Sequence, residues 1–223
     1  MSGISILYFR NLGVSNLKKI FLLCNCIIAL SSVFSQGTDS KKMKFQGYSG
    51  GMMLHTGYLF GGDLYLYDSS KPIKIQGVPF GIGGAIRFCF GEHLRIGIEG
   101  YSSNLMYGEK NNSFLSLGWG GVLIDCQWKI KKTSIFCGGT FGGGGVKNIA
   151  VVGNDLINPL EANAVYRKYG VIVITPFVGM EYAMSTKIHL IIKVDCITNL
   201  TKKQSDFVIG PRIYIGFNFS HVK

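Results

Sequence analysis

Two sets of side chains alternate between residues 187 and 198, one apolar and one mixed. The apolar set consists of Ile188, Leu190, Ile192, Val194 and Cys196, and the mixed set of His189, Ile191, Lys193, Asp195 and Ile197. Because successive side chains of an extended strand point to opposite faces, this period of two predicts a β-strand. In a soluble sandwich the apolar face would pack on a second sheet. In a transmembrane barrel it would face lipid, and the charges would point inward.

The same alternation recurs in runs long enough to cross a membrane. The runs cover residues 48–60, 78–90, 94–102, 114–130, 134–146, 171–184, 187–198 and 207–219. A tilted strand needs about 9–11 residues to cross the hydrocarbon, whereas soluble strands usually have about 5–6. Short connections alternate with long ones, as they do in membrane barrels. We predict an all-β fold, a closed antiparallel up-and-down transmembrane β-barrel of about eight strands, and a soluble secreted sandwich is the alternative.

The N-terminal segment has the pattern of a secretory signal peptide. Arg10, Lys18 and Lys19 precede an apolar stretch at 20–32, and residues 33–35 form a predicted cleavage site. The apolar stretch is shorter than the ~20 residues of a membrane-spanning helix. We therefore expect a cleaved signal peptide at 1–35 and a barrel domain at 36–223, with a retained anchor as the alternative.

Composition and charge narrow the class of partner. The chain is 47% hydrophobic and 16% charged, which excludes intrinsic disorder. The segment before the cleavage site contains three of the 23 basic residues and none of the 12 acidic residues. The mature chain therefore keeps 20 basic and 12 acidic residues. Such an exported protein is expected to face anionic lipid head groups or polysaccharide. The absence of a basic run interleaved with aromatic residues argues against nucleic acid as a partner.

The chain resembles the small outer-membrane β-barrels of Gram-negative bacteria. The resemblance rests on the signal peptide, the amphipathic runs, the alternating connections and a terminal run that carries Ile213, Ile215, Phe217 and Phe219. Segments 46–53 and 210–217 are similar to uncharacterised barrels of the Bacteroidota type. Residues 220–223 depart from the pattern, since many barrels end on their last aromatic residue. The resemblance implies a monomer in the cell outer membrane that contacts outer-membrane lipid and is inserted by the outer-membrane assembly machinery.

The charged residues of the mixed faces are predicted to meet inside the barrel. An eight-stranded barrel is just wide enough for side chains to fill, and an unpaired buried charge is costly. A network of paired ions that plugs the lumen is therefore favoured over a conducting or proton-sensing pore. We call this set the lumen network, and it consists of Arg87, Arg95, Glu99, Asp125, Glu181, His189, Lys193, Asp195 and Arg212.

An enzymatic alternative rests on His189 and Glu181. We expect a three-residue turn to place the two residues opposite each other on the inner face. An acyl hydrolase or transferase would also need a serine, and the register predicts none beside this pair. Nor does His55 have a predicted partner. The chain is therefore predicted not to be an enzyme, with no catalytic residues.

The sequence also predicts no cofactor and no metal. The glycine run at 138–145 lacks the spacing of a phosphate loop, because Val146 precedes Lys147 and Asn148 follows it. Inward glycines there are expected to leave room for larger side chains. No Cys and His spacing is typical of a zinc site.

The longest gap between runs, 147–169, is the predicted interaction loop. Asn158 as N-cap, Pro159 at the first helical position and Glu161 at the third predict a short helix through Arg167. A loop that only covers the barrel mouth is the alternative, and both remain open. The candidate interaction residues are Asn158, Pro159, Glu161, Tyr166, Arg167 and Lys168.

Cys126 and Cys137 are predicted neighbours. A two-residue turn at Lys131 and Lys132 pairs them across a hairpin on the outward face. A disulfide and two lipid-facing thiols are both compatible with this register. Taken together, the sequence predicts a structural or surface-interaction protein of the outer membrane, and the alternatives are a lipid-modifying enzyme and a narrow pore.

Overall fold

The computed structural model describes residues 44–65, 72–108, 112–152, 163–201 and 204–222. The predicted signal peptide, 1–35, lies outside these residues, as do Asn158, Pro159 and Glu161 of the predicted interaction loop. In the described part of the chain no helix is long and apolar enough to cross a membrane.

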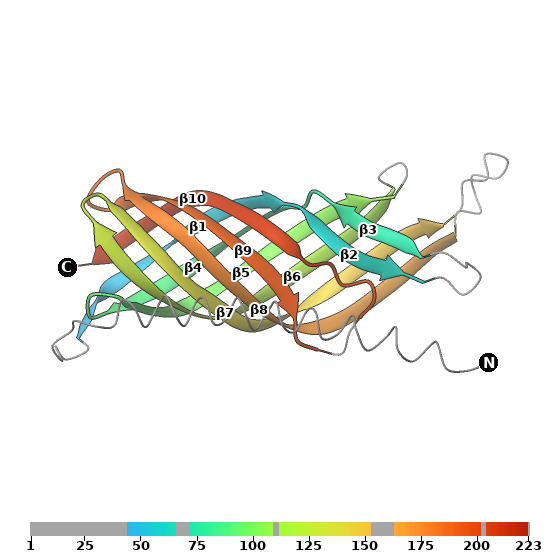
Figure 1. Cartoon of the computed structure of the whole chain (residues 1–223), viewed down its shortest axis with the longest axis horizontal. Coiled ribbons are helices and arrows are strands. Elements are labelled where there is room, and N and C mark those ends of the chain that lie inside the picture. Colours follow the sequence, from blue (N-terminus) through green and yellow to red (C-terminus); the bar gives the residue numbers. More distant parts are fainter. Residues whose placement is uncertain (1–43, 66–71, 109–111, 153–162, 202–203, 223) are drawn as a thin grey trace, which may run out of the picture. The chain divides into compact units, whose positions relative to one another are not determined.

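Eight antiparallel strands close into a barrel (Figure 1). Consecutive barrel strands pair with each other, and β1 closes the ring by pairing with β10. The strands are β1 (Phe45–Gly57), β4 (Phe80–Phe90), β5 (Leu94–Tyr107), β6 (Ser113–Ile130), β7 (Thr133–Val152), β8 (Asn163–Ala183), β9 (Ile188–Asn199) and β10 (Gly210–Val222). The closed up-and-down barrel confirms the predicted fold class. Among the residues that the structure describes, no second sheet covers the outward apolar faces as a sandwich would require.

The outside of the barrel is apolar and the inside carries the charges. In β9, Val194 points outward and is 41% exposed, while its neighbours Lys193 and Asp195 are buried. Outward residues of the other strands follow the same rule, for example Val122 and Ile215. A soluble protein buries such side chains and exposes its charges. The inverted arrangement is the one that suits a lipid environment.

Short and long connections lie at opposite ends of the barrel. The end with the connections 91–93, 131–132 and 184–187 also holds the C-terminus, and we call it the turn end. At the 131–132 turn, Lys131 adopts a φ of 57°, the left-handed conformation that two-residue hairpins require. The opposite end, which carries the longer connections, is the loop end.

Strands β7 and β8 continue well into the predicted interaction loop. Their pairing starts at Thr133 opposite Tyr182, passes Val146 opposite Tyr169 and ends at Val152 opposite Asn163. The helix predicted through Arg167 is therefore wrong for residues 163–167, which are strand. Ladder hydrogen bonds to β7 satisfy the backbone there, and this non-local pairing outweighs the local capping pattern.

A hairpin lies at the loop end, in the connection between the predicted runs 48–60 and 78–90. It consists of β2 (Leu59–Leu64) and β3 (Ile73–Gly77). The segment before β10 hydrogen-bonds to β2, with Phe60 N to Ile209 O at 2.8 Å. Gly61, Gly62 and Asp63 interrupt the apolar pattern of this hairpin in the sequence.

Candidate functional site: the barrel interior

Arg95 is the centre of the ion pairs nearest the turn end. Its Nε lies 2.5 Å from Asp125 Oδ1, and its Nη1 lies 2.7 Å from Glu181 Oε1. Arg87 Nε contacts the other oxygen of Asp125 at 3.1 Å. All four side chains are buried and come from β4, β5, β6 and β8. Two cations and two carboxylates thus compensate each other across the lumen.

A second group of charges lies deeper in the barrel. Lys193 Nζ contacts Glu99 Oε2 at 2.8 Å, and Thr140 Oγ1 donates to Glu99 Oε1 at 2.6 Å. The ammonium also lies over the rings of Tyr101 and Tyr214, at 4.8 and 4.4 Å from their centroids. Buried ion pairs need such additional contacts to offset their desolvation.

Arg212 and Asp195 form a bidentate pair between neighbouring strands β10 and β9. Arg212 Nε and Nη2 each lie 2.9 Å from one carboxylate oxygen of Asp195. Their side chains are fully buried. The structure therefore brings together eight members of the lumen network as buried, ion-paired groups, and the ninth, His189, is partly exposed.

His189 and Glu181 meet, but not in the predicted arrangement. Glu181 pairs with Ile191, and His189 pairs with Ala183, so the two residues are diagonal rather than opposite. The turn is longer than the three residues expected, which shifts the register. His189 Nδ1 still lies 3.6 Å from Glu181 Oε2.

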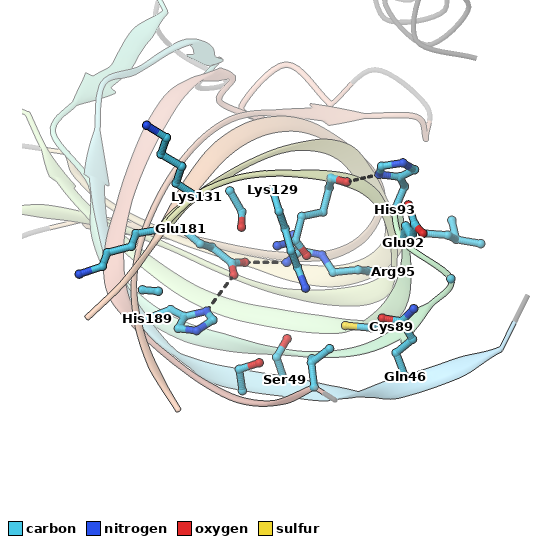
Figure 2. A pocket seen from close by; sticks show the side chains of 18 residues that line it. Gln46, Ser49, Cys89, Glu92, His93, Arg95, Lys129, Lys131, Glu181 and His189 are labelled. Atoms are coloured by element: carbon cyan, nitrogen blue, oxygen red, sulfur yellow. Dashed lines mark hydrogen bonds and ion pairs between the residues drawn. The ribbon is translucent and has the colours of Figure 1, made fainter. Parts of the chain in front are cut away.

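A serine lies beside His189 and Glu181, although the sequence analysis predicted none there. Ser134 of β7 is directly opposite Glu181 of β8. The expectation missed it because it followed only the β8–β9 hairpin and not the other neighbour of β8. Ser134, Glu181 and His189 line one cavity at the turn end (Figure 2).

That cavity has a volume of about 170 Å³. Figure 2 shows Arg95, Glu181 and His189 joined by their contacts, with Ser49 and Cys89 on other strands around the cavity. No group of His, Cys, Asp and Glu side chains suited to a metal ion occurs among the residues that the structure describes.

An apolar layer separates the ion pairs from the loop end, and the sequence analysis missed it. Its members are inward side chains of the long strands, the β2–β3 hairpin and the segment before β10: Leu59, Leu64, Ile75, Leu105, Leu115, Leu117, Val146, Ala150, Val171, Val173, Ile197, Phe207 and Val208. In the sequence, the alternation of Leu115 and Leu117 with serine and glycine indicates this apolar layer.

Polar contacts follow the apolar layer at the loop end. Tyr107 donates to Asn148 Oδ1 at 2.5 Å, and Asn148 Nδ2 donates to Asp206 Oδ2 at 3.3 Å. Arg167 Nη1 lies 3.3 Å from Asp206 Oδ1. Of the predicted interaction residues in the described chain, Arg167 thus pairs with Asp206, whereas Tyr166 and Lys168 point outward and are exposed.

The four cysteines of the described residues are free thiols. Cys126 and Cys137 are directly opposite each other on the outer face of β6 and β7, the register that the sequence predicts. Cys196 also faces outward, whereas Cys89 is buried and lines the turn-end cavity.

No protein-family profile and no curated protein matches the chain. Solved outer-membrane proteins do match its fold. The Neisserial surface protein A is 11% identical with a TM-score of 0.50, over 77% of this chain and 95% of that one. The attachment invasion locus protein Ail of Yersinia pestis is 13% identical with a TM-score of 0.46, over 79% and 99%. OprG of Pseudomonas aeruginosa is 9% identical with a TM-score of 0.47, over 81% and 99%. The chain has the closed-barrel fold of such outer-membrane proteins.

Proposed function

We propose that the chain is an outer-membrane barrel that presents a basic binding surface for anionic polysaccharide at its loop end. In this proposal the signal peptide 1–35 directs export in a bacterium of the Bacteroidota type. The outer-membrane assembly machinery then inserts a monomer into lipid, with the loop end outside the cell. The apolar exterior and the ion-paired interior support the membrane location.

The length of β7 and β8 carries the proposal of a surface role. β7 has 20 residues, whereas β4 and β9, which also reach the turn end, have 11 and 12. At about 3.3 Å per residue and a tilt of ~40°, β7 reaches ~50 Å along the membrane normal. The hydrocarbon is only ~30 Å thick, so the β7–β8 ladder extends roughly 20 Å beyond it.

Lys147 and Lys168 form the proposed contact on this ladder. They are directly opposite each other in the β7–β8 register, and both are exposed on the outer face. Lys147 is 14 residues from the start of β7, which places it ~35 Å from the turn end and beyond the hydrocarbon. Like charges directly opposite each other destabilise a sheet, and a polyanion that bridges them relieves this repulsion.

Binding of labelled dextran sulfate to intact cells that display the protein tests the proposal, with neutral dextran as the control ligand. Replacing both lysines (K147Q/K168Q) is expected to weaken binding about tenfold, which corresponds to ~1.4 kcal/mol for two surface charges. The matched double variant K129Q/K132Q alters the turn end and is expected to bind as the wild type does. Equal binding by K147Q/K168Q and wild type contradicts the proposal, as does equal binding of neutral dextran.

We further propose that the interior does not conduct ions and catalyses no reaction. The paired charges and the apolar layer support a closed lumen, because ions would have to cross a dehydrated segment. Planar-bilayer recordings of the purified barrel are expected to show no discrete channel openings, and regular openings at neutral pH would favour the pore alternative.

A further inference from the structure

We propose that the turn-end cavity is a binding site for a small phosphate-type anion, either inorganic phosphate or a soluble phosphate monoester. The cavity of about 170 Å³ lies inside the barrel mouth. That space corresponds to a few water molecules, which suits a phosphate group and is too small for a polysaccharide or a whole lipid. The site is separate from the Lys147 and Lys168 surface at the other end.

Charge is the first argument for an anion. The lining includes four cations, Arg95, Lys129, Lys131 and Lys132, but only two carboxylates, Glu92 and Glu181. Both oxygens of Glu181 are engaged, by Arg95 and by His189. Because Arg95 is already paired with Glu181 and Asp125, the excess of positive charge comes from the exposed residues Lys129, Lys131 and Lys132 at the mouth of the cavity. Figure 2 shows Lys129 directed inward and Lys131 directed away from the cavity. A phosphate carries about −1.5 to −2 at neutral pH.

Ser49 is the second and independent argument. This residue is only 3% exposed, and its hydroxyl has no hydrogen-bond partner within the described chain. Figure 2 shows its oxygen directed into the cavity. A buried hydroxyl without a partner is unfavourable, and a phosphate oxygen offers the acceptor that it lacks.

The arrangement of donors around the cavity favours phosphate over a single carboxylate. Ser134 and Ser220 line the cavity from other strands than Ser49. Lys129 is an inward residue near the end of β6, and Figure 2 shows it reaching into the mouth. Donors that converge from several directions match the oxygens of a tetrahedral anion, and lysine is a common phosphate ligand.

Isothermal titration of the purified full-length barrel in phospholipid-free detergent tests this site, with inorganic phosphate and glycerol phosphate as probes. The wild type is expected to bind one anion saturably. K129Q and Ser49→Ala are each expected to weaken binding at least tenfold, and K147Q/K168Q to leave it unchanged. Each variant is shown to be folded if its mobility on a gel differs between heated and unheated samples, as that of the wild type does.

Three outcomes overturn the proposal. They are no saturable binding of either probe, equal weakening by K129Q and K147Q/K168Q, and binding of phosphatidate in mixed micelles without binding of the soluble probes. The last outcome would locate the phosphate chemistry at a lipid head group rather than in the cavity. A failure here leaves the dextran sulfate result untouched, because that experiment reports on the opposite end of the barrel.

Discussion

Asp195→Asn removes one charge from the bidentate pair with Arg212 and leaves the guanidinium buried without compensation. Both side chains are fully buried, and two hydrogen bonds of 2.9 Å join them. A hydrogen bond to a charged group contributes about 1.5–3 kcal/mol, and breaking a buried ion pair costs about 3–5 kcal/mol. The asparagine oxygen can still accept one of the two bonds, so we expect a loss of ~3 kcal/mol in the free energy of unfolding.

Urea unfolding in lipid vesicles, followed by tryptophan fluorescence and by gel mobility without heating, measures this loss. Asp63→Asn is the matched control, since Asp63 is partly exposed on the β2–β3 hairpin, and it is expected to change stability by less than ~0.5 kcal/mol. The double variant D195L/R212M is expected to recover most of the loss, because it leaves no unpaired charge. If D195N lowers the free energy of unfolding by less than ~1 kcal/mol, the claim that Asp195 and Arg212 form a buried ion pair is refuted.

Three further predictions follow from the interior, the glycines and the cavity. Gly121→Ala is expected to impair refolding into vesicles, because a Cβ there would lie 2.3 Å from Phe141 O. Its control, Gly118→Ala, is expected to refold normally, because a Cβ there meets nothing within 4 Å. Leu117→Ala in the apolar layer is expected to cost about 2–5 kcal/mol in the same urea assay, and a change below 1 kcal/mol would argue that this layer is not packed. His189→Gln is expected to leave the phospholipid and lipid A composition of cells unchanged by mass spectrometry, and an altered acylation pattern would favour the enzyme.

The inward and outward faces of the strands were predictable because they depend on a local pattern. A period of two assigns each side chain of β9 to a face without knowledge of its neighbours, and Lys193 and Val194 lie on the predicted faces. The two-residue turn at Lys131 and Lys132 likewise fixed the pairing of Cys126 with Cys137.

The elements that the sequence prediction missed depend on contacts between distant segments. Val165 pairs with Ala150 in the β7–β8 extension, and this ladder is invisible to a helix-capping pattern read along one segment. Burial of Leu59 and Ile75 requires the segment before β10, which is more than 120 residues away in the chain. Contacts of this range leave no local periodicity.

The inner site was predictable in composition but not in geometry. Inward positions followed from the alternation, so Arg95, Asp125 and Glu181 were expected inside the barrel. Which carboxylate meets which cation depends on the stagger between strands, and a turn of unexpected length moved His189 to a diagonal of Glu181. The same stagger determines that Ser134 faces Glu181.

A nitroxide at position 194 tests most directly the claim that the apolar face of the barrel contacts lipid. The label is attached to Val194→Cys in a variant whose native cysteines are replaced by serine, and the barrel is reconstituted in vesicles. Paramagnetic relaxation compares its accessibility to oxygen, which concentrates in lipid, with that to a water-soluble nickel chelate. The lipid-facing barrel predicts that oxygen relaxes the label more strongly, and stronger relaxation by the nickel chelate would contradict it.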